Sequence, residues 1–329
     1  MVRFGIEFVP RDVYWRTVYY TIEAEKAGFN YVWITDHYNN RNVYVTLTLI
    51  ANYTDRIKLG PGVTNPYVCS PVFTATAVAS LAEIAPGRVV CGIGAGDKVT
   101  LTMIGLTWRK PLAHVRECVQ AIRALTAGEV LNLDGKAFKI EGARLNYKPP
   151  SEIPVYIGAQ GPAMLRLAGE IGDGVLVNAS HPKDLELAVS RIKEGVSRAG
   201  RSLEALDIGA YTSFSIAEDE SKAVKAVIPV VAFIVGGSPD VVLERHGIDL
   251  EKANVIKDAL TKAKFGKAFK NVTEDMVEAF SIAGTPKQCI DKIEEVLKTG
   301  VTQFVVGSPI GPNVLKAIKM IGEKIIPVF

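Results

Sequence analysis

The chain has 329 residues, and its 38 basic and 35 acidic side chains give a formal net charge of +3 at neutral pH. Charges of both signs are interspersed, which gives no support for nucleic acid or a charged membrane surface as partner. The four cysteines lack metal-ligand spacing, so neither a zinc site nor a disulfide framework is indicated. The sequence shows no secretion signal and no apolar run near the ~20 residues that span a bilayer, so a cytoplasmic protein is expected.

Short β-branched runs alternate with helical patterns along the chain, which is typical of repeated strand–helix units and a parallel sheet. Eight units favour a closed (β/α)8 TIM barrel, and an open doubly wound sheet is the alternative. The predicted strands are residues 3–9, 31–35, 57–63, 88–94, 154–158, 174–178, 206–212 and 303–307. The helical stretches between them include residues 13–27, 72–85, 109–127, 182–199, 284–299 and 312–325.

Two segments interrupt the alternation of strands and helices. Residues 128–153 carry turn signals and short strand-like pieces, which predict a hairpin. Residues 218–281 are longer and mostly helical. Both are expected to be insertions in a single barrel domain spanning residues 1–329. The apolar segment 227–235 would be exposed unless the second insertion covers the site or forms a subunit contact. A homodimer or homotetramer is therefore predicted. An ordinary helix packed on the barrel is the alternative.

The first predicted strand carries the first candidate catalytic residue. Barrel enzymes place their chemistry at the carboxyl ends of the strands, where side chains converge. The two-residue period of a strand directs Phe4, Ile6 and Phe8 outward to the helices and Glu7 toward the barrel axis. A half-buried carboxyl near the mouth tends to have a raised pKa, which suits a general acid working near neutrality. A structural ion pair is the alternative for Glu7.

The ends of strands two to six carry small or polar residues. They are Asp36 and His37 on the second, Gly62, Val63, Thr64 and Asn65 on the third, Gly94, Ala95, Gly96 and Asp97 on the fourth, Gly158, Ala159, Gln160 and Gly161 on the fifth, and Asn178 on the sixth. Asp36 and His37 either contact a ligand or cap the next helix. The fourth strand end does not fit GxGxxG, because Asp97 occupies the sixth position. Its glycines either let a flat ring approach the backbone or only make a tight turn. The fifth turn runs into a helix start that can bind a phosphate.

Longer segments of the chain resemble a known family. Residues 56–97, 153–178 and 283–307 are similar to the bacterial luciferase-like superfamily of flavin and deazaflavin barrels. Within that superfamily, "GIEFVP", "TDHYNNRNVY" and "GAGDK" resemble the archaeal methylenetetrahydromethanopterin reductases, which use coenzyme F420, a 5-deazaflavin. The resemblance spans nearly the whole chain.

The resemblance implies hydride transfer from reduced F420 to 5,10-methylenetetrahydromethanopterin, in methanogenesis or, in reverse, in methyl oxidation. It implies that the strand-end residues hold the cofactor and that the Gly62–Val63 peptide is cis. Opening the methylene bridge requires a proton on the departing nitrogen. Glu7 is the expected acid, and Asp97 is expected to stabilise the cation or share the proton relay. The chemistry needs no metal.

Three other functions stay open. Another F420-dependent dehydrogenase, acting on an alcohol or a sugar phosphate, would use His37 as its base and leave Glu7 without a task. An FMN-dependent luciferase-like monooxygenase would need an oxygen-reactive flavin. A non-catalytic flavin-binding protein on the same barrel would bind the cofactor without turnover.

Overall fold

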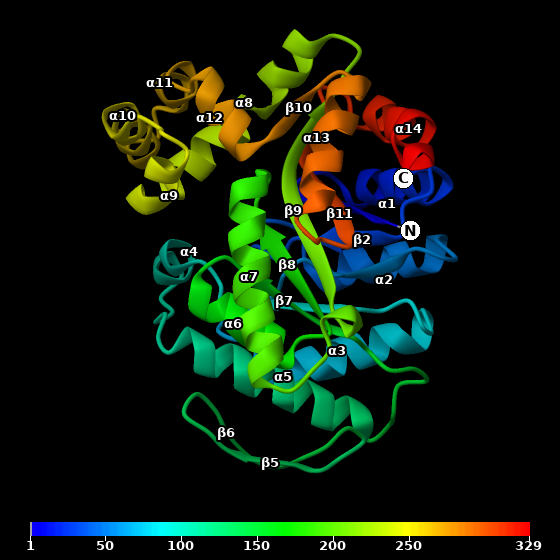
Figure 1. Ribbon diagram of the computed structural model, residues 1–329. Helices are drawn as coiled ribbons and strands as arrows, with labels where there is room; N and C mark the ends of the chain where they lie inside the picture. Colours follow the sequence, from blue (N-terminus) through cyan, green and yellow to red (C-terminus); the bar gives the residue numbers. More distant parts are fainter. Residues whose placement is uncertain (1) are drawn as a thin grey trace.

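Eight parallel strands form the centre of the computed structural model, which describes residues 2–329 (Figure 1). They are β1 (Arg3–Phe8), β2 (Tyr31–Ile34), β3 (Lys58–Pro61), β4 (Cys91–Gly94), β7 (Val155–Ala159), β8 (Gly174–Asn178), β9 (Asp207–Ile216) and β11 (Gln303–Ile310). Their order is β3-β2-β1-β11-β9-β8-β7-β4. Isolated bridges from Leu59 to Val89 and from Thr64 to Ile93 connect the two ends of this order. The predicted barrel is therefore confirmed, and an open doubly wound sheet is excluded.

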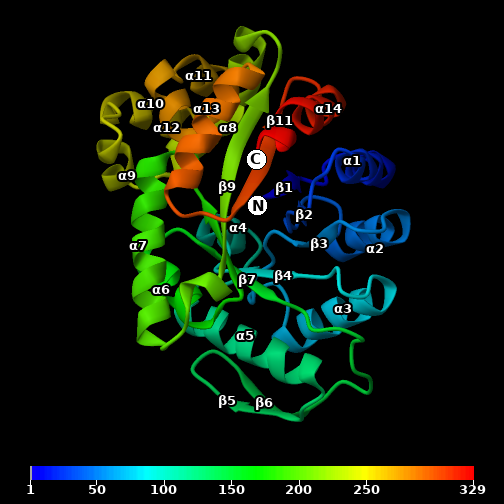
Figure 2. The ribbon, with the colours of Figure 1, turned by 45° about the vertical axis from the view of Figure 1, so that its right-hand side comes forward.

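Helices surround the barrel, with α1 to α3 along one side and α6 and α7 along the other (Figure 2). They are α1 (Tyr14–Lys26), α2 (Val43–Tyr53), α3 (Pro71–Ile84), α4 (Lys98–Met103), α5 (Pro111–Ala127), α6 (Pro162–Ile171), α7 (Pro182–Arg198), η1 (Leu203–Ala205), α13 (Pro286–Lys298), α14 (Val314–Lys324) and η2 (Ile326–Val328). Local sequence fixes several starts. Asn42 caps α2 by accepting hydrogen bonds from the N–H groups of Tyr44 and Val45, and Thr285 forms a capping box with Gln288 at α13.

The two faces of the barrel strands divide the core into an outer and an inner cluster. Phe4, Ile6 and Phe8 pack in the outer cluster beneath the helices, as predicted. The inner cluster consists of Tyr31, Trp33, Val90, Tyr156, Leu176 and Val305. Glu7 is buried and points inward, as the alternation of the strand predicts. The barrel is thus packed solid beneath its mouth, and the space for a ligand lies above these rings.

Residues between α5 and β7 form an antiparallel hairpin, β5 (Leu131–Asp134) and β6 (Lys139–Ala143), outside the barrel beneath α5 (Figure 1). The Glu117 carboxylate of α5 accepts hydrogen bonds from the N–H groups of Lys136, Ala137 and Phe138 at 2.8–2.9 Å. The hairpin loop is therefore fixed to α5 by one buried carboxylate.

A helical segment follows β9 and lies beside the barrel (Figure 1, upper left). It comprises α8 (Glu220–Gly237), α9 (Asp240–Arg245), α10 (Leu250–Thr261), α11 (Phe265–Lys270), α12 (Glu274–Phe280) and β10 (Ile282–Gly284), which pairs with β9. These helices share a core of their own. Within residues 227–235 that core buries Val227, Val231, Ala232 and Val235, whereas Phe233 is exposed. The apolar segment is therefore mostly covered within the chain. Among residues 2–329, no helix combines the length and apolar character that crossing a bilayer requires.

Candidate active site

A cavity of about 880 Å³ opens at the carboxyl ends of the barrel strands. All the predicted site residues line it except Thr64. They are Glu7, Asp36, His37, Gly62, Val63, Asn65, Gly94, Ala95, Gly96, Asp97, Gly158, Ala159, Gln160, Gly161 and Asn178. A second groove, of about 1120 Å³, lies away from the carboxyl ends of the strands, outside α5, and is lined by charged side chains of both signs. The strand-end cavity is the candidate site, because the predicted residues converge only there.

Val63 forms a raised apolar surface in the cavity. The Gly62–Val63 peptide is cis, which confirms the expectation from the resemblance. A Cβ atom on Gly94 would lie 2.6 Å from a Val63 methyl, and one on Gly158 would lie 3.1 Å from both Val63 methyls. These two glycines therefore make room for Val63. The sequence analysis offered ring approach or a tight turn for Gly94 and a phosphate-binding turn for Gly158. The Tyr211 hydroxyl donates to the Gly62 carbonyl at 3.1 Å and fixes the segment from β9.

Glu7 is the buried carboxyl of the cavity. Its Oε2 accepts a hydrogen bond from the Ser308 N–H at 2.6 Å. Burial raises the pKa of Glu7, and the Ser308 contacts and the positive charge of Arg11 offset part of that rise. The closest polar contact is thus a backbone amide and not a cation, which argues against a structural ion pair. A carboxyl in this setting retains its proton at higher pH than an exposed one.

Asp36 is held by a hydroxyl at the rim. Its Oδ2 accepts a hydrogen bond from the Thr64 Oγ1 at 2.6 Å. Thr64 is buried and does not line the cavity, so it acts by orienting Asp36. Asn42, and not Asp36 or His37, caps the next helix, which removes the capping alternative. His37 lies exposed at the mouth, with Nδ1 3.4 Å from the Asn40 amide nitrogen.

Asp97 begins α4. Its Oδ1 accepts a hydrogen bond from the Thr100 N–H at 2.6 Å, so the carboxylate caps the short helix. Asp97 is exposed, in contrast to Glu7. Gly96, with φ of 68°, makes the left-handed turn that precedes it. The two predicted acids therefore lie in opposite environments, since Glu7 is buried and Asp97 is exposed to solvent.

The turn after β7 is suited to an anion. Gly161 is the N-cap of α6, and Pro162 at the first helical position has no N–H. The first-turn amides are those of Ala163 and Met164, and both residues line the cavity. The Gln160 side chain donates to the Asn178 carbonyl at 3.4 Å and connects this turn to β8. The cavity thus combines an apolar surface for a flat ring with helix amides for a phosphate, which fits a flavin-like cofactor.

Sequence reasoning missed an apolar wall and four hydroxyl-bearing residues of the cavity. The wall includes Val68, Leu101, Ile104, Trp108, Pro111 and Leu112, and the hydroxyls belong to Thr35, Tyr38, Thr100 and Tyr211. Trp108 donates its indole N–H to the Ala95 carbonyl at 2.8 Å, which ties the wall to the end of β4. The same strand-end argument applied to residues 206–212 would have indicated Tyr211. The wall follows the strand ends by several residues, so that argument does not reach it.

The whole chain is similar to several known proteins. A family model described as luciferase-like monooxygenase matches residues 9–303. The 5,10-methylenetetrahydromethanopterin reductase of Archaeoglobus fulgidus is 55% identical over 330 residues, covering 99% of each chain. The solved coenzyme F420-dependent tetrahydromethanopterin reductase of Methanopyrus kandleri has a TM-score of 0.95 at 50% identity, covering 100% of this chain and 99% of that one. The F420-dependent glucose-6-phosphate dehydrogenase of Beutenbergia cavernae is 28% identical, covering 92% of this chain and 89% of its own.

Proposed function

We infer that this chain, which belongs to the luciferase-like monooxygenase family and within it to the 5,10-methylenetetrahydromethanopterin reductases, transfers a hydride between coenzyme F420 and 5,10-methylenetetrahydromethanopterin. One observation carries the inference. The sequence identity to the Archaeoglobus reductase is 55% over nearly the full chain, whereas the identity to the sugar-phosphate dehydrogenase is 28%. The buried Glu7 carboxyl agrees with it, because an alcohol dehydrogenase would need a base and not a protonated acid.

Bound reduced F420 supplies the hydride from C5 of its deazaflavin ring. Val63 offers the apolar surface for that ring, and the first turn of α6 offers amides for its phosphate. The full set proposed to hold the cofactor is Asp36, His37, Gly62, Val63, Thr64, Asn65, Gly94, Ala95, Gly96, Asp97, Gly158, Ala159, Gln160, Gly161 and Asn178. Thr64 belongs to it through its bond to Asp36.

Glu7 is proposed as the general acid. The substrate carbon bridges two nitrogens and becomes a good hydride acceptor only when one C–N bond opens to an iminium. A proton on the departing nitrogen assists that opening, and Glu7 is the cavity carboxyl whose pKa burial raises. Asp97 is proposed to stabilise the cation electrostatically, since its exposed, helix-capping carboxylate suits a fixed negative charge better than a proton relay.

The experiment that tests the function is anaerobic mixing of the purified protein with reduced F420 and 5,10-methylenetetrahydromethanopterin. We expect the absorbance of oxidised F420 to appear only when both are present, together with 5-methyltetrahydromethanopterin. Oxidation with an alcohol or a sugar phosphate in place of the pterin would identify a different dehydrogenase. Consumption of the cofactor in air alone would identify a monooxygenase, and binding without turnover would identify a non-catalytic protein.

The rate should depend on pH through Glu7. The acid must be protonated, so the rate of pterin reduction should fall as pH rises through the raised pKa of Glu7. The free energy of unfolding should also fall as pH rises, because the pKa of Glu7 in the folded state lies above that of an unfolded glutamate. Its contribution is complete below the unfolded pKa and is lost as pH rises through the folded pKa. Single-turnover rates and urea unfolding measured across the same pH range check both, and a rate that is flat in pH would contradict the assignment.

A homodimer or homotetramer in the cytoplasm is also proposed. Trp15 of α1 and Tyr53 of α2 are 61% and 54% exposed and contact each other edge-on, with ring centroids 6.0 Å apart. Exposed aromatic clusters of this kind favour burial in an interface. Light scattering on the eluted protein would measure the mass, and Trp15→Glu should shift it toward the monomer if this surface is the contact.

A further inference from the structure

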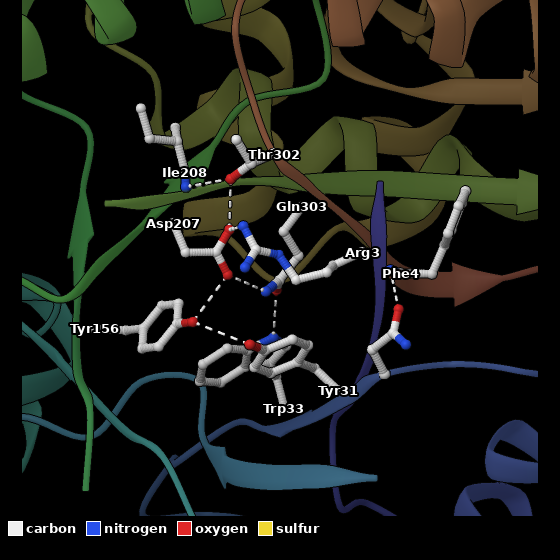
Figure 3. A network of polar contacts seen from close by, with 10 residues as sticks. Arg3, Phe4, Tyr31, Trp33, Tyr156, Asp207, Ile208, Thr302 and Gln303 are labelled. Carbon is white, nitrogen blue, oxygen red and sulfur yellow. Dashed lines mark hydrogen bonds and ion pairs between the residues drawn. The ribbon is translucent and has the colours of Figure 1, made fainter. Parts of the chain in front are cut away.

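A polar network fills the lower part of the barrel interior (Figure 3), where most (β/α)8 barrels stack branched aliphatic side chains. Asp207 lies at its centre. Thr302 donates to one carboxylate oxygen at 2.6 Å, and Gln303 and Tyr156 donate to the other at 2.9 and 2.8 Å. Arg3 pairs with the first oxygen at 2.8 Å. Both oxygens of the buried carboxylate are therefore partnered.

The network extends upward to Trp33. The Gln303 amide oxygen accepts a hydrogen bond from the Trp33 indole N–H at 3.0 Å, and both side chains are completely buried. The ring of Tyr31 stacks on the indole with the ring centroids 5.8 Å apart, and the ring of Tyr156 meets it edge-on with the centroids 5.1 Å apart. A Cβ atom on Gly5 would lie 3.2 Å from both atoms of the Trp33–Gln303 bond, so glycine leaves room for it. Trp33 is thereby held in one orientation.

Trp33 lies directly beneath the cavity. A Cβ atom on Gly62 would lie 2.7 Å from the Trp33 Cβ and 3.4 Å from its ring, so the Gly62 backbone rests on this side chain. Tyr211 holds the Gly62 carbonyl from β9. Trp33 does not itself line the cavity, so any effect that it has on the site passes through the Gly62–Val63 segment.

We propose that Gln303, anchored by Asp207, is a positioning residue, which fixes the Trp33 indole and so sets the height of Val63 in the cavity. The proposal rests on the proposed function, in which Val63 supports the hydride-donating ring. Hydride transfer depends steeply on the separation of donor and acceptor, and a misplacement of ~1 Å can cost roughly a hundredfold in rate. A network of directional hydrogen bonds holds its members more rigidly than an interchangeable aliphatic layer, which explains its place under the site.

The test compares Gln303→Met with Thr302→Val. Gln303→Met keeps the volume but removes the bonds to Trp33 and to Asp207. Thr302→Val also removes a donor to Asp207, together with the acceptor of the Ile208 N–H, but leaves the bond between Trp33 and Gln303 in place. Both variants should melt at lower temperature. Only Gln303→Met should weaken binding of oxidised F420, measured by its fluorescence, and lower the single-turnover rate by roughly ten- to a hundredfold. The isotope effect with C5-deuterated cofactor should also rise, because hydride transfer then limits the rate more completely.

Trp33→Phe keeps a ring under Gly62 but loses the indole N–H, so it should show the same losses of binding and rate as Gln303→Met. It serves as the test variant if Gln303→Met folds poorly. Wild-type binding and rate in a folded Gln303→Met or Trp33→Phe would overturn the proposal, as would equal losses in Thr302→Val. Failure of the wild-type protein to oxidise reduced F420 with the pterin would instead overturn the proposed function. The binding comparison can still be made in that case.

Discussion

Glu7→Gln is expected to lower the rate of pterin reduction by roughly 10²–10⁴-fold while F420 binds almost as in the wild type. The amide has the size of the carboxyl, and its oxygen can still accept the Ser308 N–H bond. It cannot deliver a proton to the departing nitrogen. Single-turnover absorbance of the cofactor measures the rate, and cofactor fluorescence measures the binding.

The stability of Glu7→Gln separates a catalytic from a structural role. Burial raises the pKa of Glu7, so the wild type pays for ionising this group as pH increases. The variant should therefore equal or exceed the wild type in free energy of unfolding at neutral pH. Glu25→Gln is the matched control, because Glu25 accepts backbone N–H bonds from Asp55, Arg56 and Ile57 away from the cavity. That control should lose stability but keep its rate, and full activity in Glu7→Gln would remove Glu7 from the mechanism.

Gly94→Ala is expected to weaken F420 binding by more than roughly tenfold and to lower turnover with it. The added methyl would lie 2.6 Å from a Val63 methyl, so Val63 must shift into the space proposed for the ring. Overpacking of this size typically costs about 1–3 kcal/mol, enough for a tenfold to hundredfold change in affinity if the displaced group meets the ligand. Titration of cofactor fluorescence measures the loss.

Removing the clash should restore the site. The double variant Gly94→Ala/Val63→Ala returns the lost space, so it should bind F420 more tightly than Gly94→Ala alone. Gly266→Ala is the control, because a Cβ atom there would meet nothing within 4 Å. Unchanged binding in Gly94→Ala would show that Val63 does not support the cofactor.

The sequence was informative wherever the position of a side chain follows from strand period alone. Glu7 lies in the barrel because residues alternate along β1, and Asp36 and Asp97 reach the cavity because they follow β2 and β4. The closed barrel was predictable for a related reason, since eight strand–helix units require a parallel sheet that can close on itself.

Features that depend on contacts between strands were not predictable. Thr64 was expected in the cavity, but its hydroxyl turns to Asp36 on the neighbouring strand. Gly94 was expected either to let a ring approach or to make a tight turn, and its lack of a side chain makes room for Val63. The apolar residues 227–235 were expected to cover the site, form a subunit contact or pack on the barrel, and helices that follow them in the chain cover most of them. Strand period cannot supply such information, because each contact joins segments whose spacing only the folded chain defines.

Whether Glu7 is a proton donor can be read from the infrared difference spectrum of wild type minus Glu7→Gln. At pH 7 we expect a band from a protonated carboxyl that is present in the wild type, absent in the variant and lost as pH rises. A carboxylate band in its place, already present at pH 7, would show that Glu7 is ionised and cannot be the general acid.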